Sequence, residues 1–226
     1  RQDRIRFVQV RHEEAAAFMA CGYAKWTGRI GCCLATSGPG GIHLLNGLYD
    51  ANRSGASVLA LASHIPSRQI GSGYFQETHP DRLFTECSVY SELISTTDQA
   101  PRVVRDAIRH AVGLRGVAVV TLPGDIADLD ATAPTPDCHP IEAGALSPAP
   151  AAVQRLADAI NAADKVAIFA GAGVEGAHDR VIELAARIKA PIGHSLRGKD
   201  FIQYDSPFDI GMTGLLGYGA AAEGIE

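Results

Sequence analysis

Short apolar runs rich in β-branched residues alternate along this chain with longer stretches of helical pattern, and this alternation restricts the fold more than any other feature. The runs predict strands at residues 6–10, 30–37, 57–63 and 117–123, and the stretches between them predict helices at residues 11–28, 42–54 and 100–116. Strands that alternate with helices form parallel sheets, because each crossover helix brings the chain back to the end of the sheet where the previous strand began, and the next strand then runs in the same direction. We therefore predict an α/β fold with a largely parallel sheet.

A change of composition divides the chain into two parts. Residues 125–150 are rich in Asp, Ala, Thr and Pro, which is typical of an interdomain linker. We predict an N-terminal domain at residues 1–130, a linker at 131–150 and a second domain at 151–226. In the second domain the pattern predicts helices at 151–164 and 178–190 and strands at 165–171 and 191–196, too few strands to close a sheet.

Composition and charge argue against several classes of protein. The net charge of −5 and the scarcity of basic runs argue against a nucleic-acid partner. No stretch approaches the roughly 20 apolar residues of a membrane span. The five cysteines are odd in number and lack the spacing of metal ligands, so we expect reduced thiols in a cytoplasmic protein and no metal site.

The helix predicted at residues 11–28 is apolar on every side, so we expect it to be surrounded by protein. Its first turn nevertheless carries Glu13 and Glu14. An ordinary surface acid that complements the helix dipole is one interpretation of Glu13. The alternative is a ligand-binding acid, because open α/β sheets bind ligands where strands end and helices begin. A partly desolvated Glu13 would favour its protonated form and suit proton sharing with a ligand nitrogen.

Two glycine-rich turns also follow predicted strands. The turn "TSGPGG" at residues 36–41 is either a tight structural turn or a place where the backbone approaches a ligand. The turn "GAGVEGA" at residues 171–177 matches the dinucleotide fingerprint, but no acid stands about 20 residues further on to hold a ribose. This argues against NAD and leaves a flavin, another nucleotide phosphate, or a structural turn.

Taken in order, these stretches resemble the thiamine-diphosphate (ThDP) enzymes, and among them the flavin-dependent pyruvate oxidases and quinone-reducing pyruvate dehydrogenases. The segments that carry the resemblance are "RHEEAAAF", "TSGPGG", "IHLLNGLYDA", "ALASHIPS", "IGSGYFQETHP", "TLPGDIA", "HSLRGK" and "YDSPFDIGMTGL". The resemblance implies a parallel-sheet pyrimidine-binding domain that lacks its first residues, followed by the first part of a Rossmann-like central domain that binds FAD. It also implies that the pyrophosphate-binding domain, with the ligands of Mg²⁺, lies outside this chain.

The resemblance further implies roles for individual residues. Glu13 corresponds to the family's acid that hydrogen-bonds the pyrimidine ring of ThDP, whereas Glu14 is expected to be structural. Pro39 and His43 fall where the family lines the pyrimidine pocket, although many relatives have Asn at the place of His43. Phe75 and Gln76, in a long polar stretch, match the active-site loop. The residues implied to hold FAD are Gly171, Ala172, Gly173, Ser195, Leu196, Arg197, Gly211 and Met212.

The activity implied by the resemblance is oxidative decarboxylation of pyruvate to acetate and CO2, with electrons passed to a quinone. The full-length protein is then expected to be a homo-oligomer, a dimer or a tetramer, in the cytoplasm or peripheral at the inner face of the membrane. Two alternatives remain, an acetolactate-synthase-like carboligase and an inactive truncated product that acts at most as a binding module. We expect this chain alone not to turn over 2-oxo acids.

Overall fold

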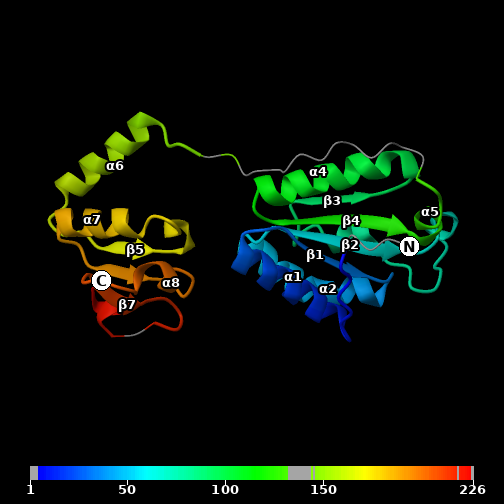
Figure 1. Cartoon of the computed structure of the whole chain (residues 1–226), viewed down its shortest axis with the longest axis horizontal. Coiled ribbons are helices and arrows are strands. Elements are labelled where there is room, and N and C mark those ends of the chain that lie inside the picture. The colour runs from blue at the N-terminus through cyan, green and yellow to red at the C-terminus, as the bar shows by residue number, and fades with distance from the viewer. Residues whose placement is uncertain (1–4, 132–143, 145, 218, 225–226) are drawn as a thin grey trace. The chain divides into compact units, whose positions relative to one another are not determined.

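The computed structural model describes residues 5–131, 144, 146–217 and 219–224, and the chain divides into two compact units at residues 1–145 and 146–226 (Figure 1). Each unit is described by itself. Most of the predicted linker at residues 131–150 falls outside the described residues.

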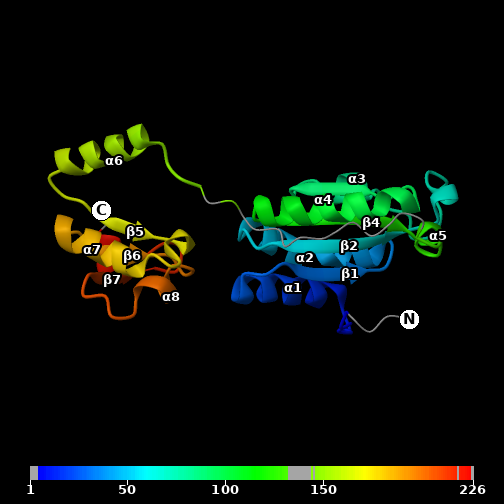
Figure 2. The ribbon, with the colours of Figure 1, turned by 45° about the horizontal axis from the view of Figure 1, so that its top comes forward.

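The first unit is a sheet of four parallel strands with helices on both faces. The strand order is β1(Gly31–Ala35), β2(Val58–His64), β4(Val117–Pro123), β3(Tyr90–Leu93). Helices α1(Glu13–Thr27) and α2(Pro39–Arg53) cover one face, and α4(Ala100–Gly113) covers the other (Figures 1 and 2). The short elements are η1(Ser67–Gln69), α3(Pro80–Leu83), η2(Thr97–Gln99) and α5(Gly124–Ala127). The predicted α/β class with a parallel sheet is confirmed.

Strand β4 shows why the central runs of the sequence are continuously apolar. Val117 and Val119 face the core beneath α1 and α2, whereas Ala118 and Val120 face the core beneath α4. A strand that is covered on both faces has no solvent side, so polar alternation disappears from its sequence. The apolar run at residues 117–123 was therefore a reliable strand signal.

Helix α1 packs closely on its neighbours through small residues but is not surrounded by protein. A Cβ added at Gly47 would lie 2.6 Å from the Cβ of Ala17, so α1 and α2 approach each other almost backbone to backbone. The outer side of the helix stays exposed, with Trp26 at 91% of its full accessibility. The exposed apolar residues of α1 are Phe18, Met19, Tyr23 and Trp26. The expectation of burial on every side was wrong, because an all-apolar sequence does not specify how many neighbours are present.

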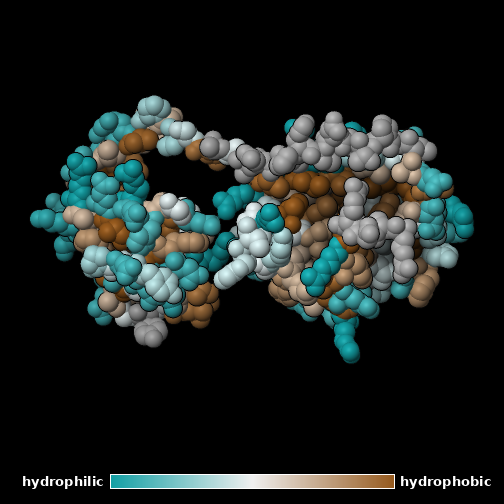
Figure 3. All heavy atoms as spheres, viewed as in Figure 1, coloured by the Kyte–Doolittle hydropathy of each residue, from teal (hydrophilic) through white to brown (hydrophobic). Residues whose placement is uncertain are grey.

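The strand predicted at residues 6–10 is absent. These residues have no regular structure, and Phe7 and Val8 remain 69% and 52% exposed. Strand β1 is an edge of the described sheet, so no strand of the described chain pairs along its outer side. A β-rich run becomes a strand only when a partner offers its backbone donors and acceptors. Figure 3 shows the apolar surface that this unit exposes in the view of Figure 1.

The second unit is a smaller parallel sheet in the order β5(Ile168–Ala170), β6(Ile192–His194), β7(Asp209–Met212). Its helices are α6(Pro150–Ala162), α7(His178–Ile188), α8(Lys199–Ile202) and α9(Ala220–Glu223), with η3(Ala172–Val174) after β5 (Figure 2). A core of Ala170, Ala185, Ile192 and Ile202 joins α7 and α8 to the sheet. Strand β7 was not predicted, and it completes a three-stranded sheet that the sequence had not led us to expect.

None of the described helices combines the length and the apolar composition that crossing a membrane requires.

Candidate functional site

Three side chains meet where α1 and α2 begin. His12 is the N-cap of α1, Glu13 is its first residue, and His43 lies in the second turn of α2. The Nδ1 atom of His43 is 3.0 Å from Oε2 of Glu13, and the rings of His12 and His43 stack with 4.5 Å between their centroids. The close packing of the two helices brings together side chains that are 30 residues apart.

The hydrogen bond to His43 favours the charged form of Glu13. It lowers the pKa of Glu13 below the usual value, with a smaller contribution from backbone hydrogen bonding, and these effects outweigh the opposing effect of burial. The Glu13 side chain is 31% exposed. Our expectation that desolvation would favour the protonated form was wrong, because local sequence did not reveal the imidazole partner.

Glu14 has different partners from those of Glu13. Its side chain accepts a hydrogen bond from Asn46 Nδ2, and its backbone N–H donates to Nδ1 of His12 at 3.2 Å. The first bond links α1 to α2, and the second caps the start of α1. The two neighbouring acids therefore occupy separate environments.

The turn between β1 and α2 lies directly against the long loop that follows β2. Gly38 has a φ of 65°, and a Cβ there would lie 2.8 Å from the backbone oxygen of Gln76. Ser37 Oγ donates to Oε1 of Gln76 at 3.2 Å, and Gln76 itself has a φ of 63°. Pro39 follows as the first residue of α2. Phe75, next to Gln76, is 79% exposed.

A second contact places Glu13 near the same turn. A Cβ added at Gly40 would lie 3.3 Å from Oε1 of Glu13, so that oxygen lies directly beside the glycine. The structure thus brings Glu13, Pro39, His43 and Gln76 into one neighbourhood around the strand-to-helix turn.

Sequence reasoning missed Glu77, which organises the loop that carries Phe75 and Gln76. Its carboxylate accepts hydrogen bonds from the backbone N–H groups of Gly71, of Gly73 at 2.7 Å, and of Tyr74 at 3.1 Å. The Gly71 bond and the other backbone bonds together lower the pKa of Glu77 despite the opposing effect of burial. The two glycines a few residues before an acid were the available sequence signal.

A similar contact holds the start of that loop. Asp125 in α5 accepts from the backbone N–H of Ser67 at 2.8 Å and from its hydroxyl at 2.6 Å. Hydrogen bonding to Ser67 lowers the pKa of Asp125. Because the partners are 58 residues apart, nothing in the local sequence indicated this contact.

In the second unit, the predicted flavin residues gather at one edge of the sheet. They follow or end the three parallel strands at their carboxyl ends: Gly171, Ala172 and Gly173 after β5, Ser195, Leu196 and Arg197 after β6, and Gly211 and Met212 in β7. Ser195 connects two of these strands, since its N–H donates to the Ala170 oxygen at 3.0 Å. Its Oγ also accepts from the N–H of Gly198 at 3.1 Å. Leu196 is 64% exposed.

A buried histidine adjoins this edge and was not anticipated as a site residue. His194 is 1% exposed, with Nδ1 3.1 Å from the Ser195 oxygen and Nε2 3.4 Å from Oδ1 of Asp209. Asp209 also accepts from the N–H of Gly211 at 3.1 Å. This acid thus links the ends of β6 and β7.

Two family models match most of the chain. Residues 1–83 match the thiamine pyrophosphate enzyme N-terminal TPP binding domain, and residues 153–226 match the thiamine pyrophosphate enzyme central domain. TPP and ThDP denote the same compound.

Individual relatives align over nearly the whole chain. A 42.6 kDa protein of the isoamylase 3′ region in Pseudomonas amyloderamosa is 49% identical over 96% of this chain and 56% of its own length. The pyruvate oxidase of Lactiplantibacillus plantarum is 32% identical over 99% of the chain and 38% of its own length. An acetolactate synthase of Arthrospira platensis is 31% identical, over 94% and 38%. The chain therefore spans about two fifths to just over half of the length of these relatives.

The two domain matches, in the same order as the two α/β units, and the alignments across nearly the whole chain lead to one conclusion: this chain belongs to the thiamine pyrophosphate enzyme family.

Proposed function

We propose that this chain is part of a ThDP- and FAD-dependent oxidoreductase that converts pyruvate to acetate and CO2 and passes the electrons to a quinone. The observation that carries the ThDP part is the position of Glu13, whose carboxylate lies at the start of α1 between His43 and the glycine turn. When bound, ThDP supplies the chemistry of carbonyl addition and decarboxylation, and FAD supplies a two-electron acceptor.

The residues around Glu13 fit an aminopyrimidine ring. The ring offers nitrogen donors and acceptors, and Glu13 offers its second carboxylate oxygen, Oε1, beside Gly40. His43 holds the other oxygen, Oε2, and so fixes the orientation of the carboxylate. In this arrangement Glu13 exchanges a proton with a ring nitrogen through Oε1. The lowered pKa of Glu13 favours the carboxylate as its starting form.

The loop beside the turn suits a role in substrate binding. Gln76 is anchored by Ser37, and the exposed ring of Phe75 is free to cover a bound substrate and exclude water from it. Glu77 keeps this loop in shape through its backbone hydrogen bonds. We assign Phe75 and Gln76 to the active site on this basis together with the family resemblance.

The edge of the second sheet fits a flavin nucleotide. Ligands of open α/β sheets bind outside the carboxyl ends of the strands. At this edge a Cβ added at Gly173 would meet no atom within 4 Å, so the turn has an uncovered side, and Gly211 has a φ of 99°.

Mg²⁺ prefers an all-oxygen ligand set. Among the described residues the one group of three close metal-ligating side chains is His12, Glu13 and His43, which does not suit it, so we assign Mg²⁺ no ligand in this chain.

Matched variants of the two neighbouring acids test the ThDP assignment in the full-length protein. Glu13→Gln removes the proton-exchanging group, so exchange of the C2 proton of bound ThDP should slow by about two to four orders of magnitude. Glu14→Gln keeps an oxygen that can accept from Asn46 and removes only a charge 3.9 Å from His12, so it should exchange at nearly the wild-type rate. Equal rates in the two variants would contradict the role of Glu13.

The flavin assignment has an optical test. The full-length protein should copurify with FAD, and its absorbance should bleach when pyruvate is added without oxygen. A colourless protein, or a flavin spectrum that pyruvate does not change, would contradict electron transfer to FAD.

An acetolactate-synthase-like carboligase is the second candidate, supported by the alignment with the Arthrospira platensis enzyme at nearly the same identity as the pyruvate oxidase. Our preference for oxidation rests on the likeness of the loop "IGSGYFQETHP" to the oxidases. The two reactions share their first steps, and each 1.36 kcal/mol of relative barrier changes the product ratio tenfold. Incubation of the full-length enzyme with pyruvate and a soluble quinone distinguishes them: acetate supports our proposal, and acetolactate as the main product supports the carboligase.

A further inference from the structure

One cluster of side chains in the first unit has the composition of a metal site. The ligand atoms of His12, Glu13 and His43 lie within 4.8 Å of one another, and no other group of three such side chains does so within the residues that the structure covers. Two imidazoles and one glutamate are a ligand set that holds Zn²⁺ in proteins, with a water molecule in the fourth position. The spacing of the cysteines carries no information about this site, because its ligands are histidine and glutamate.

The distances within the cluster are close to those of a tetrahedral site. With Zn–N and Zn–O bonds of about 2.0–2.1 Å, neighbouring ligand atoms lie about 3.3 Å apart. Nδ1 of His43 is 3.0 Å from Oε2 of Glu13, so a metal ion can replace the proton between them with little movement. The ring of His12 stacks on that of His43 with 4.5 Å between the centroids. The ligand atom of His12 therefore has to come closer by no more than about 1.5 Å.

The three side chains are accessible to an ion from solvent. Their exposed fractions are 53% for His12, 44% for His43 and 31% for Glu13. Burial thus does not prevent the rotations that bring the ligand atoms together.

Coordination by His12 has one structural cost. Its Nδ1 atom accepts a hydrogen bond from the backbone N–H of Glu14, so the neutral ring carries its proton on Nε2. An ion at Nε2 moves that proton to Nδ1, and an ion at Nδ1 occupies the acceptor itself, so this cap of α1 is lost in both cases. In the first case the new Nδ1–H group can turn to the Glu14 carboxylate, whose Oε2 atom is 3.9 Å away. Metal-bound histidines commonly donate to such a carboxylate.

We propose that His12, Glu13 and His43 bind a Zn²⁺ ion. The ion is coordinated by Nδ1 of His43, one carboxylate oxygen of Glu13 and one ring nitrogen of His12, with water in the fourth position. Mg²⁺ and Ca²⁺ prefer oxygen ligands and should bind far more weakly. Because coordination occupies Glu13, Zn²⁺ and ThDP exclude each other in the full-length protein. That consequence rests on the proposed function, whereas the metal site does not.

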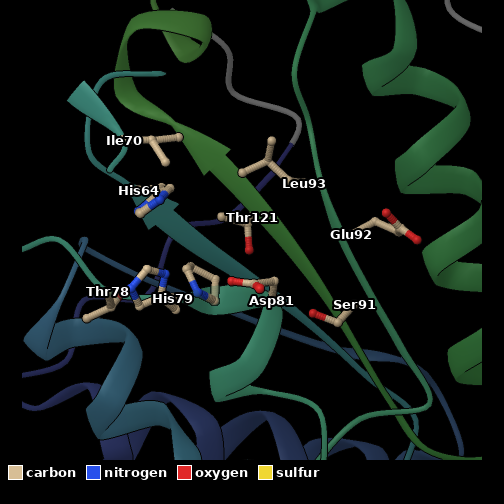
Figure 4. Close-up of a pocket in the computed structure, with 10 residues that line it drawn as sticks. His64, Ile70, Thr78, His79, Asp81, Ser91, Glu92, Leu93 and Thr121 are labelled. Atoms are coloured by element: carbon tan, nitrogen blue, oxygen red, sulfur yellow. The ribbon is translucent and has the colours of Figure 1, made fainter. Parts of the chain in front are cut away.

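Two further histidines of the first unit serve as an internal control. His64 and His79 line a cavity of about 310 Å³ together with Asp81, and Figure 4 shows these side chains around that space. These three described side chains do not form a close group of ligand atoms. Zn²⁺ should therefore leave the ring signals of His64 and His79 unchanged at concentrations that saturate the proposed site.

Nuclear magnetic resonance of this chain, prepared without a histidine tag, tests the proposal. Zn²⁺ should shift the ring signals of His12 and His43 until one equivalent is bound, with a dissociation constant on the order of micromolar. The backbone amide signal of Glu14 should shift with them, because the cap is lost. No saturable shift, an equal response to Mg²⁺, or a Glu14 amide that ignores Zn²⁺ would overturn the three-ligand site.

Variants identify the ligands. His43→Phe keeps a ring, and His12→Asn keeps a side chain that can cap α1. Each should raise the dissociation constant of Zn²⁺ about tenfold or more, because one of three protein ligands is lost. His110→Phe on α4 is the matched control and should leave the constant unchanged. The backbone spectrum of each variant checks the fold. An unchanged constant in either ligand variant would overturn the proposal.

Discussion

Glu13 and His43 lie 30 residues apart in the sequence, yet their side chains are joined by a hydrogen bond of 3.0 Å. Because this bond favours the charged carboxylate, its contribution to stability is present above the ordinary glutamate pKa. That contribution is lost as the pH falls through the lowered pKa. Both side chains are partly exposed, so the contribution to the free energy of unfolding is small. The larger consequence is chemical, since the bond holds Glu13 as a carboxylate in a fixed orientation.

Replacing the imidazole measures how strongly one residue controls the other. In His43→Phe, which keeps a ring but removes the hydrogen bond, the pKa of Glu13 should rise toward its ordinary value, because the bond is the largest cause of its lowering. Carboxyl-carbon nuclear magnetic resonance titration of this chain would follow the change. His110→Phe on α4 serves as the control and should leave Glu13 unchanged. An unaltered Glu13 titration in His43→Phe would mean that the helix start, not the imidazole, sets the pKa.

At this scale, the sequence predicted which residues lie near one another better than it predicted their contacts. Glu13 and the turn at residues 36–41 were singled out because each lies where a predicted strand is followed by a predicted helix, which is a local pattern. The lowered pKa of Glu13 depends on His43, and the shape of the loop depends on Glu77 and Asp125. The contacts of Glu13 and Asp125 join parts of the chain that are far apart in sequence, so no local pattern contains them.

Among the secondary-structure elements, α1 and α2 pack so closely that a single methyl group matters. Gly47→Ala would place its Cβ 2.6 Å from the Cβ of Ala17 and 2.8 Å from the Phe18 nitrogen, so it should destabilise the first unit by about 2–3 kcal/mol. Gly22→Ala, in α1 with no atom within 4 Å of the new Cβ, should instead stabilise it by about 0.5–1 kcal/mol. Urea unfolding of both variants measures the difference. The same sign for both would show that helix propensity, not packing, dominates.

The loop that carries Phe75 should depend on Glu77. Glu77→Gln weakens the hydrogen bonds to the N–H groups of Gly73 and Tyr74, so cleavage by chymotrypsin at Tyr74 and Phe75 should speed up about fivefold. In the wild type the same loosening should appear as the pH falls through the lowered pKa of Glu77. Glu175→Gln is the matched control. Equal cleavage rates in the variant and the wild type would show that the loop holds its shape without Glu77.

The elements themselves were predictable where pairing or burial is complete. Strands β2 and β4 and helix α2 were found because each has two covered faces or a clear apolar stripe. The short edge strand β3 has intermediate and exposed residues and was missed, as was β7. Residues 6–10 have a strand-like composition, but no strand of the described chain pairs with them. The composition of a segment cannot say whether a partner is present.

For the whole molecule, the reactivity of the buried cysteine thiols should measure the unfolding of the first unit alone. The described buried cysteines all belong to that unit: Cys21, Cys33 and Cys87. Burial raises the pKa of Cys33 to about 12 and that of Cys87 to about 11, so the native chain should leave both unmodified at pH 8.

Increasing urea should expose these thiols in a single transition of the first unit. Pulsed alkylation with peptide mass spectrometry would follow Cys33 and Cys87, and hydrogen exchange of β5 and β6 would follow the second unit. Because each unit has its own core, the midpoints should differ. Coincident midpoints for thiols and amides would instead indicate one cooperative structure.

The strand order of the first unit has a consequence for synthesis on the ribosome. Strand β4 pairs with both β2 and β3, so the four-stranded sheet stays incomplete until residues 117–123 have left the exit tunnel. At about 5–20 residues per second, β2 waits on the order of 3–12 seconds for this partner. Meanwhile the apolar faces of α1 and α2 have only the strands β1 and β2 to cover them. The nascent chain should therefore bind chaperones that recognise apolar segments, and release from them should follow the emergence of β4.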